Sequence, residues 1–351
     1  MTLEPQVRPG AMALPQAPAA RLLRCTGVRQ ETADVKTFML ESATGAEFGW
    51  LPGQYLTVNL ETAQGPAARC YTISSIPADG LQITVKALPG GPVSNWLHDC
   101  LLPGGLLEAH GPQGVFTPEP GHWQKYLFLA AGSGITPLAS ITRALRLSGA
   151  PVDAVLLYSM RTPADAIFGA ELRGIEASSG IRVELLPSTG GPGGRGRLDA
   201  AALAALVPDA AGREVFACGP ASYLAAVRGM LELAGCASER LHVESYDIAA
   251  HAPAQASPCA TPDTKVFSVE FAASGRTIQC PADSFVLEAA LAAGIAVPSN
   301  CTLGMCGTCK SALLAGSVEM NHAGGIRPRE IAAGKILLCC SKPSSDLVID
   351  A

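Results

Sequence analysis

The chain has 351 residues, a formal net charge of −5 and 12 cysteines, and 48% of its residues are hydrophobic. This length and hydrophobic content predict two or three folded domains and exclude a chain that is disordered throughout. The mildly acidic charge argues against nucleic acid as a partner, because phosphate binding favours a basic surface.

Residues 1–20 are rich in Pro and Ala and lack a basic stretch followed by an apolar run, so we expect a disordered tail and not a signal peptide. No apolar run reaches the ~18 residues that a membrane helix requires. Several cysteines cluster near the C-terminus, which favours metal binding in a reducing compartment over a disulfide framework. We therefore expect a cytoplasmic monomer that does not associate with a membrane.

Residues 21–120 contain short β-like runs separated by Gly, Pro and Asp, and this pattern predicts a small antiparallel β-barrel. The run RCYTISS contains the groups that a flavin needs. Arg69 can reach a phosphate and Tyr71 can stack on the isoalloxazine ring, and the two share one face of a strand. Thr72 and Ser74 can hydrogen-bond the edge of the ring. The alternative is an ordinary core strand.

The run GGPVSNWL is the second part of the expected flavin site. Its glycines precede an expected helix start at Ser94, where unpaired backbone N–H groups suit an anion such as a phosphate. The run HGPQGVF at residues 110–116 is then expected to close the barrel.

Between residues 121 and 248, apolar strands alternate with helix-like stretches, which predicts a parallel α/β sheet. The run GSGITP follows a strand and leads into a helix. Gly132 and Gly134 let the backbone approach a pyrophosphate at the helix N-terminus, and Pro137 fits a first helical turn. The run is not the GxGxxG fingerprint, so a plain strand–turn–helix is the alternative. For Cys218, in the later run FACGP, the alternative is a buried core thiol.

Residues 249–263 are rich in Ala, Pro and Ser without periodicity, and we expect them to be a linker. Residues 264–351 then predict a separate domain with two strands, a helix, a cysteine loop and terminal strands.

The cysteine loop predicts an iron–sulfur site. Cys301, Cys306 and Cys309 have the x4 and x2 spacing of plant-type [2Fe–2S] sites. A zinc site favours two short Cys-x2-Cys pairs, and only one such pair occurs here. Spacing alone leaves the fourth ligand open between Cys339 and Cys340.

The flavin and nicotinamide runs resemble, in the same order, those of the ferredoxin–NADP reductase superfamily. The resemblance implies FAD, with FMN as the alternative, and NADH or NADPH as the electron donor. The implied flavin ligands are Arg69, Tyr71, Thr72, Ser74, Gly91, Val93 and Ser94. The expected nicotinamide-binding residues are Gly132, Ser133, Gly134, Thr136, Arg161, Cys218, Gly219 and Pro220. The expected catalytic residues are Tyr71, Ser74, Thr136, Cys218 and Glu244, with Tyr246 close to the flavin.

The last domain resembles a plant-type ferredoxin with a β-grasp fold. That resemblance implies Cys339 as the fourth ligand, because Pro343 follows it four positions later. The charges of this domain balance, whereas plant ferredoxins are strongly acidic, so docking through a broad acidic surface is not expected. Docking is expected to use shape and a few cations near the cysteine loop: Lys310, Arg327, Arg329 and Lys342.

The domain order resembles reductase components of Rieske-type oxygenases, and residues 320–350 resemble those of quaternary-amine demethylases such as the glycine betaine type. The expected function is transfer of electrons from NAD(P)H through flavin and a [2Fe–2S] cluster to a partner oxygenase. Alternatives are the reductase of a hybrid-cluster protein, the reductase of a di-iron epoxidase of the phenylacetyl-CoA type, and a diaphorase that reduces small acceptors. An alternative of another class is a redox sensor without turnover.

Overall fold

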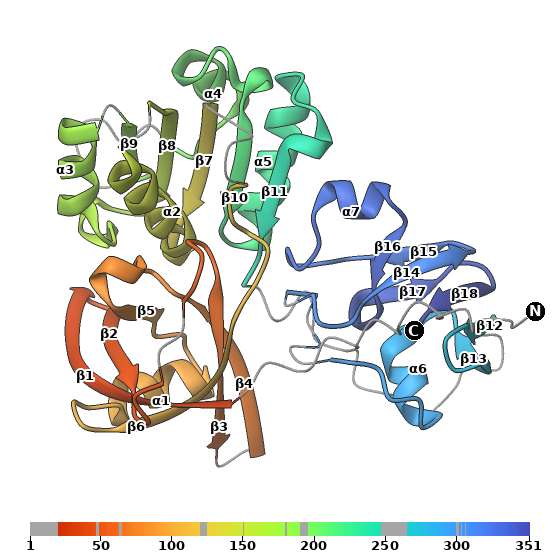
Figure 1. Cartoon of the computed structure of the whole chain (residues 1–351). Coiled ribbons are helices and arrows are strands. Elements are labelled where there is room, and N and C mark those ends of the chain that lie inside the picture. Colours follow the sequence, from red (N-terminus) through yellow and green to blue (C-terminus); the bar gives the residue numbers. More distant parts are fainter. Residues whose placement is uncertain are drawn as a thin grey trace, which may run out of the picture.

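The computed structural model describes residues 20–46, 49–62, 65–119, 125–149, 151–179, 181–189, 196–246, 265–299, 302, 304–305 and 307–351. They form three domains, of which the first two lie one above the other and the third lies beside both (Figure 1). The segment expected to be a linker and nearly all of the expected N-terminal tail lie outside the described residues. Residues 121 and 248, where the second domain was expected to begin and end, also lie outside the described residues.

The first domain is a six-stranded antiparallel sheet with the order β4-β3-β6-β1-β2-β5. An isolated bridge between Ile73 and Ile83 joins the end of β4 to β5, so the sheet closes into the expected barrel. Its elements are β1 Ala20–Thr32, β2 Val35–Ser42, β3 Tyr55–Thr62, β4 Gly65–Thr72, β5 Leu81–Lys86, α1 Pro92–Cys100 and β6 Leu106–Gln113.

The second domain is a five-stranded parallel sheet with the order β11-β10-β7-β8-β9. Its strands are apolar on both faces because helices cover both, as parallel sheets require. Along β7, for example, Leu127 and Leu129 belong to one core, while Tyr126, Phe128 and Ala130 belong to the other. Its strands are β7 Lys125–Ala131, β8 Asp153–Met160, β9 Arg182–Pro187, β10 Glu214–Cys218 and β11 Leu241–Glu244. Its α-helices are α2 Ile135–Ser148, α3 Gly169–Ser179, α4 Ala200–Leu206 and α5 Ala221–Leu233.

The third domain has a mixed sheet with the order β13-β12-β18-β14-β16, in which β12 and β18 are parallel, and a separate β15-β17 pair. Helix α6 packs against this sheet in the expected β-grasp arrangement. Its strands are β12 Val266–Phe271, β13 Arg276–Pro281, β14 Lys310–Ala315, β15 Val318–Met320, β16 Lys335–Leu337, β17 Ser341–Pro343 and β18 Leu347–Asp350. Its α-helices are α6 Val286–Ala292 and α7 Pro328–Ala332.

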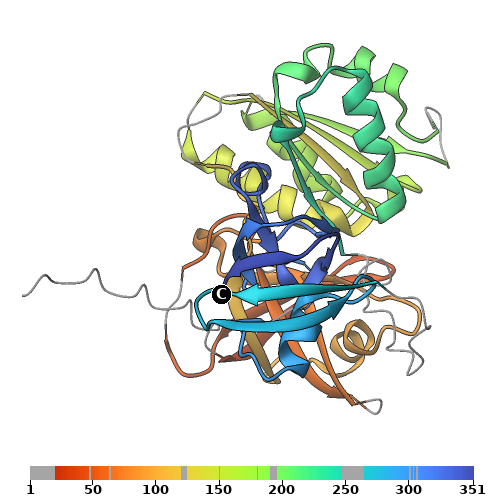
Figure 2. The same cartoon turned by 90° about the vertical axis from the view of Figure 1, so that its right-hand side faces the viewer.

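Specific contacts hold the three domains together. Ser140 of α2 donates a hydrogen bond to the carbonyl oxygen of Ser75 in the first domain (2.8 Å). The third domain lies in front of the barrel, with α7 reaching the second domain (Figure 2). No helix among the described residues is long and apolar enough to cross a membrane.

Candidate functional site

A pocket of about 260 Å³ opens where the barrel meets the second domain. It is lined by β4, the end of β5, the start of α1, the turn before α2 and Tyr246. The expected flavin ligands that line it are Arg69, Tyr71, Thr72, Gly91, Val93 and Ser94. The sequence motifs, which are separated along the chain, therefore meet in one place.

Ser74 differs from the other expected flavin ligands. Its side chain is buried inside the barrel, where its hydroxyl lies 2.8 Å from that of Thr84. Thr84, and not Ser74, lines the pocket. Strand β4 ends at Thr72, two residues before Ser74, so the alternation within the strand does not determine where the Ser74 side chain points. This is why a strand pattern extended to Ser74 does not place its hydroxyl at the pocket.

Helix α1 begins at Pro92, two residues before the expected start at Ser94. A proline is favoured in a first turn because its missing N–H has no helical partner there. The Ser94 hydroxyl instead accepts a hydrogen bond from the Leu88 N–H (3.2 Å) and donates one to the Gly91 carbonyl (3.3 Å). A Cβ on Gly91 would lie 2.6 Å from this hydroxyl, so glycine keeps the turn tight. The N–H groups of the first turn of α1 lie at the pocket and suit a phosphate.

Lys86 is a pocket cation that sequence reasoning missed. It lines the pocket together with Arg69, and its ammonium group lies 2.5 Å from a carboxylate oxygen of Asp34. Lys86 ends the alternating run LQITVK, in which Thr84 and Lys86 share one face of the strand. This alternation could have placed Lys86 on the same side as the pocket.

The turn between β7 and α2 forms the opposite wall of the site. A Cβ on Gly134 would lie 2.3 Å from the carbonyl oxygen of Cys218, so only glycine allows the turn to lie this close to the end of β10. Ser133 and Thr136 from this turn line the pocket, and the Thr136 hydroxyl donates to the Ser133 carbonyl (3.1 Å). Thr136 and Cys218, both expected near the nicotinamide, are thereby neighbours of the flavin pocket.

Glu244 and Tyr246 complete a buried polar group at this wall. The Tyr246 hydroxyl donates to a carboxylate oxygen of Glu244 (2.8 Å) and is hydrogen-bonded to the hydroxyl of Thr72. Burial raises the pKa of the Glu244 carboxyl to about 8, although the hydrogen bond from Tyr246 acts in the opposite direction. Burial, together with the nearby Glu244, also raises the pKa of the Cys218 thiol. At neutral pH the site thus holds a mainly protonated carboxyl and a neutral thiol.

The remaining residues expected to bind the nicotinamide cofactor lie along the carboxyl edge of the parallel sheet. Gly219 and Pro220 follow β10, and Pro220 caps α5. Arg161 follows β8 and is exposed, and its carbonyl oxygen accepts from the Thr189 N–H (2.8 Å). Ligands of open α/β sheets bind along this edge.

Among the predicted cluster ligands, Cys301 and Cys306 lie outside the described residues. Cys309 and Cys339 are buried, and the Cys339 thiol is hydrogen-bonded to both Cys309 and Cys340. The Gly304 N–H donates to the Cys339 sulfur (3.2 Å). The Cys340 sulfur is also buried and lies 3.6 Å from the Leu337 carbonyl oxygen.

These sulfur positions fit an iron–sulfur cluster. Buried thiolate donors and a backbone N–H directed at a sulfur are what such a site requires. The described residues alone bring no three potential metal ligands together, because two of the four predicted cysteines are not among them.

A small apolar core lies between the pocket lined by the expected flavin ligands and the cysteine loop. Tyr55 of the barrel and Met305 and Ala323 of the third domain form a small apolar core, against which Cys70 and Tyr246 pack. Cys70 and Tyr246 also line the flavin pocket, and Met305 directly precedes Cys306. The two expected cofactor sites therefore face each other across this core.

Three family models match the chain in the order of its domains. An oxidoreductase FAD-binding domain matches residues 23–117, and an oxidoreductase NAD-binding domain matches residues 128–229. A 2Fe-2S iron-sulfur cluster binding domain matches residues 269–344.

Similar proteins match over nearly the whole chain. The glycine betaine monooxygenase reductase subunit of Pseudomonas aeruginosa is 39% identical over 346 residues, covering 94% of each protein. The stachydrine N-demethylase reductase subunit of Rhizobium meliloti is 36% identical, covering 95% of this chain and 97% of that protein. The structure of phthalate dioxygenase reductase aligns with a TM-score of 0.58 and 27% identity, covering 95% of this chain and 98% of the other.

Proposed function

Because this chain belongs to the family of oxygenase reductase subunits, we propose that its partner is a Rieske-type oxygenase that demethylates a quaternary amine, with NADH as the donor. The chain is an NAD(P)H-dependent oxidoreductase that passes electrons through FAD and a [2Fe–2S] cluster to a terminal oxygenase. FAD, when bound, converts a hydride into single electrons, and the protein supplies its binding and orientation.

The observation that carries the choice of partner is similarity along the full length to two reductase subunits. One serves a glycine betaine monooxygenase and the other a stachydrine N-demethylase. Glycine betaine and stachydrine are both quaternary ammonium carboxylates, so a betaine is the substrate class that this similarity favours.

The pocket supports the proposed flavin-binding roles. Arg69, Lys86 and the first turn of α1 would hold the phosphates of FAD, because they bring the positive charge and free N–H groups of the pocket together. Tyr71 would stack on the ring system, and Thr72 would hydrogen-bond its edge. Ser74 would act indirectly, by holding the hydroxyl of Thr84 in the pocket wall.

The nicotinamide would lie against the turn before α2, next to Thr136 and Cys218. Gly132–Gly134 and Gly219–Pro220 would hold its pyrophosphate at the carboxyl edge of the sheet. The Glu244 carboxyl, mainly protonated at neutral pH and bonded to Tyr246, would limit the charge in this part of the site while a hydride crosses it. Arg161 is proposed to lie at the adenosine end of the cofactor.

The cluster is proposed to be held by Cys301, Cys306, Cys309 and Cys339. Thiolate ligands require reduced cysteines, which supports a reducing compartment such as the cytoplasm. We also propose that the protein is monomeric, which its elution volume in gel filtration would test.

The cations that were expected to contact the partner oxygenase interact with residues of this chain. Lys310 is bonded to Glu330 at 2.8 and 3.0 Å, and both Arg327 and Arg329 form ion pairs with Glu119. Lys342 lies over the ring of Phe285. These cations have partners within the chain, so shape complementarity is the more important factor in the proposed docking, and only a shallow salt dependence is expected.

The test is reconstitution with purified Rieske-type demethylases. The expected result is formaldehyde release from glycine betaine or stachydrine, faster with NADH than with NADPH. The choice of partner would be contradicted by no turnover with any betaine demethylase together with fast reduction of a hybrid-cluster protein or a di-iron epoxidase. Faster turnover with NADPH would contradict only the choice of donor.

A further inference from the structure

The edge strand of the second domain is covered by a loop of the third domain, residues 322–325. The Ser245 N–H, just after β11, donates a hydrogen bond to the Ala323 carbonyl oxygen (3.1 Å). Gly324 has a φ of +113°. A Cβ on Gly324 would lie 2.5 Å from the Val243 carbonyl oxygen and 3.1 Å from the Glu244 Cα. Both its backbone angle and its position against β11 therefore require glycine.

The same loop is bonded to the cysteine loop inside the third domain. The Ala323 and Gly325 N–H groups both donate to the Gly304 carbonyl oxygen, at 3.1 and 2.9 Å. The Gly304 N–H in turn donates to the sulfur of Cys339 (3.2 Å). A series of hydrogen bonds through the backbone thus connects the Cys339 sulfur to Ser245. Ser245 lies between Glu244 and Tyr246 of the proposed nicotinamide and flavin site.

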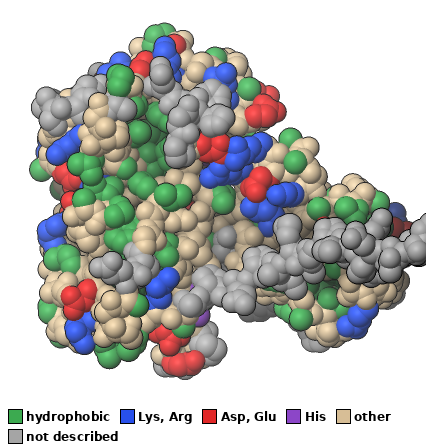
Figure 3. Space-filling view, viewed as in Figure 1, with side chains coloured by type: hydrophobic (Ala, Val, Ile, Leu, Met, Phe, Trp, Pro, Cys, Tyr) green, Lys and Arg blue, Asp and Glu red, His purple; other side chains and the backbone are tan. Residues whose placement is uncertain are grey.

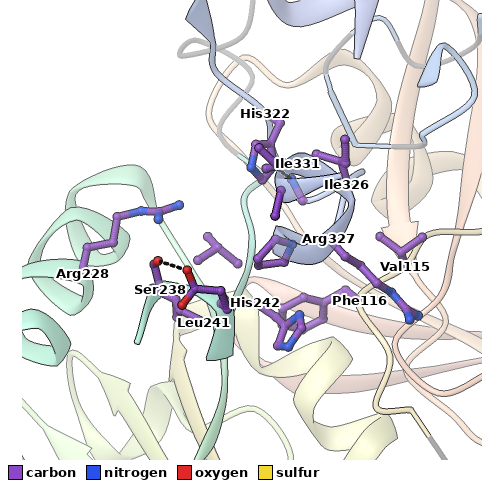
Figure 4. Close-up of a pocket in the computed structure, with 15 residues that line it drawn as sticks. Val115, Phe116, Arg228, Ser238, Leu241, His242, His322, Ile326, Arg327 and Ile331 are labelled. Carbon is purple, nitrogen blue, oxygen red and sulfur yellow. Dashed lines mark hydrogen bonds between the residues drawn. The ribbon is translucent and has the colours of Figure 1, made fainter. Parts of the chain in front are cut away.

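Much of the remaining boundary between the second and third domains is open. A cleft of about 330 Å³ separates β11 from α7, with Leu241 and His242 on one side and Ile326 and Ile331 on the other (Figure 4). A further contact of the third domain is the ion pairing of Arg327 and Arg329 with Glu119, which follows the last strand of the barrel. Figure 3 shows acidic and basic side chains gathered on this face of the molecule. Gly324 is thus the point at which the backbone of the third domain packs closely against the end of β11.

We propose that Gly324 is a positioning residue for electron transfer from the flavin to the cluster, because it sets the separation between the cysteine loop and the flavin pocket. The inference rests on the proposed flavin and cluster sites. The step transfers one electron at a time from the reduced flavin to the oxidised cluster, and no covalent bond forms or breaks. Electron tunnelling weakens exponentially with distance, so a small displacement of the loop slows this step without affecting hydride transfer.

Three glycine substitutions separate positioning from cluster binding. Gly324→Ala places a methyl group against the second domain. Gly325→Ala places it 2.6 Å from the Met305 carbonyl carbon, inside the third domain's own cysteine loop. Gly275→Ala is the matched control, because Gly275 also has a positive φ (+65°) but no heavy atom lies within 4 Å of the added Cβ.

The measurements are iron and flavin content, NAD(P)H–ferricyanide activity, stopped-flow reduction of the cluster, and hydrogen exchange of residues 241–246. Gly324→Ala should keep both cofactors and its ferricyanide activity, but reduce the cluster severalfold more slowly, because the added methyl group moves the cysteine loop away from the flavin pocket. Its Ser245 amide should exchange faster than in the unmodified protein. Gly275→Ala should match the unmodified protein in every measurement, and Gly325→Ala should lose iron.

A Gly324→Ala protein with an unchanged rate of cluster reduction and an unchanged Ser245 exchange rate would overturn the inference. So would loss of iron in this variant, because Gly324 would then serve cluster binding. If the variant does not fold, Glu119→Gln tests the same docking through its second contact, where slower cluster reduction and faster Ser245 exchange are expected and no change would refute the proposal. An unmodified protein without flavin or iron would contradict the proposed sites themselves.

Discussion

The hydroxyl of Tyr246 lies 2.8 Å from a carboxylate oxygen of Glu244, and Glu244 is buried. Burial raises the pKa of this carboxyl to about 8. In the unfolded chain the same group loses its proton near pH ~4.3. Folding therefore takes up a proton between these two pH values, which links the stability of the protein to pH.

Glu244→Gln should abolish this linkage. The folded state binds the extra proton, so raising the pH from about 5 to about 8 should lower the free energy of unfolding of the unmodified protein. The glutamine variant carries no titrating group at this position and should lose less stability over the same range. Urea unfolding at several pH values measures the difference. Parallel pH profiles for the two proteins would mean that Glu244 titrates normally.

Gly134→Ala should weaken the nicotinamide site. The added Cβ would overlap the Cys218 carbonyl, at 2.3 Å, and a clash between two backbone segments is relieved only if the turn before α2 moves. Overpacking of this kind typically costs about 1–3 kcal/mol. We expect that loss of stability, together with slower flavin reduction by NAD(P)H.

The control for this change is Gly174→Ala. Gly174 lies in helix α3, and no heavy atom lies within 4 Å of a Cβ added there. Alanine should stabilise the helix by about 0.5–1 kcal/mol and leave flavin reduction unchanged. Thermal unfolding and stopped-flow flavin reduction decide between the two outcomes. Equal effects of the two substitutions would show that space at Gly134 is not the limiting factor.

Serine substitutions should distinguish the adjacent cysteines. The Cys339 sulfur accepts a hydrogen bond from the Gly304 N–H, whereas the Cys340 sulfur lies 3.6 Å from the Leu337 carbonyl oxygen. Serine at Cys301, Cys306, Cys309 or Cys339 should therefore abolish cluster binding, and Cys340→Ser should retain it. Iron analysis and visible absorption spectra are the measurements. An iron-free Cys340→Ser protein would move the fourth ligand by one residue.

Sequence reasoning worked best where one short motif contains its own chemistry. The run around Arg69 and Tyr71 and the turn at Gly132–Gly134 predicted the walls of one pocket, because each motif depends on local backbone geometry. The three-domain order was predicted for the same reason, since changes of hydrophobic period mark where barrel, parallel sheet and β-grasp domain begin.

Contacts between domains could not be predicted in this way. Glu119 is paired with Arg327, and Ser245 with Ala323, across long separations in sequence, and no local pattern encodes which surfaces meet. Because the sequence does not show that Arg327 and Arg329 pair with Glu119, these cations were expected to bind a partner protein instead. Likewise, the depth of Ser74 depends on the end of β4, which local alternation does not determine.

A chain that ends at Tyr246 should retain hydride transfer and lose electron delivery. Both walls of the flavin pocket lie within residues 69–246, so NAD(P)H should still reduce ferricyanide through the flavin. Reduction of cytochrome c or of the oxygenase should fail, because the cysteine loop is missing. Removing the third domain also uncovers the end of β11, beside which the Ser245 N–H is otherwise bonded to the Ala323 carbonyl, and exposed edges favour association. The shortened chain should therefore form oligomers in gel filtration more readily than the full chain. Full activity of the shortened chain towards the oxygenase would show that electrons do not leave through the third domain.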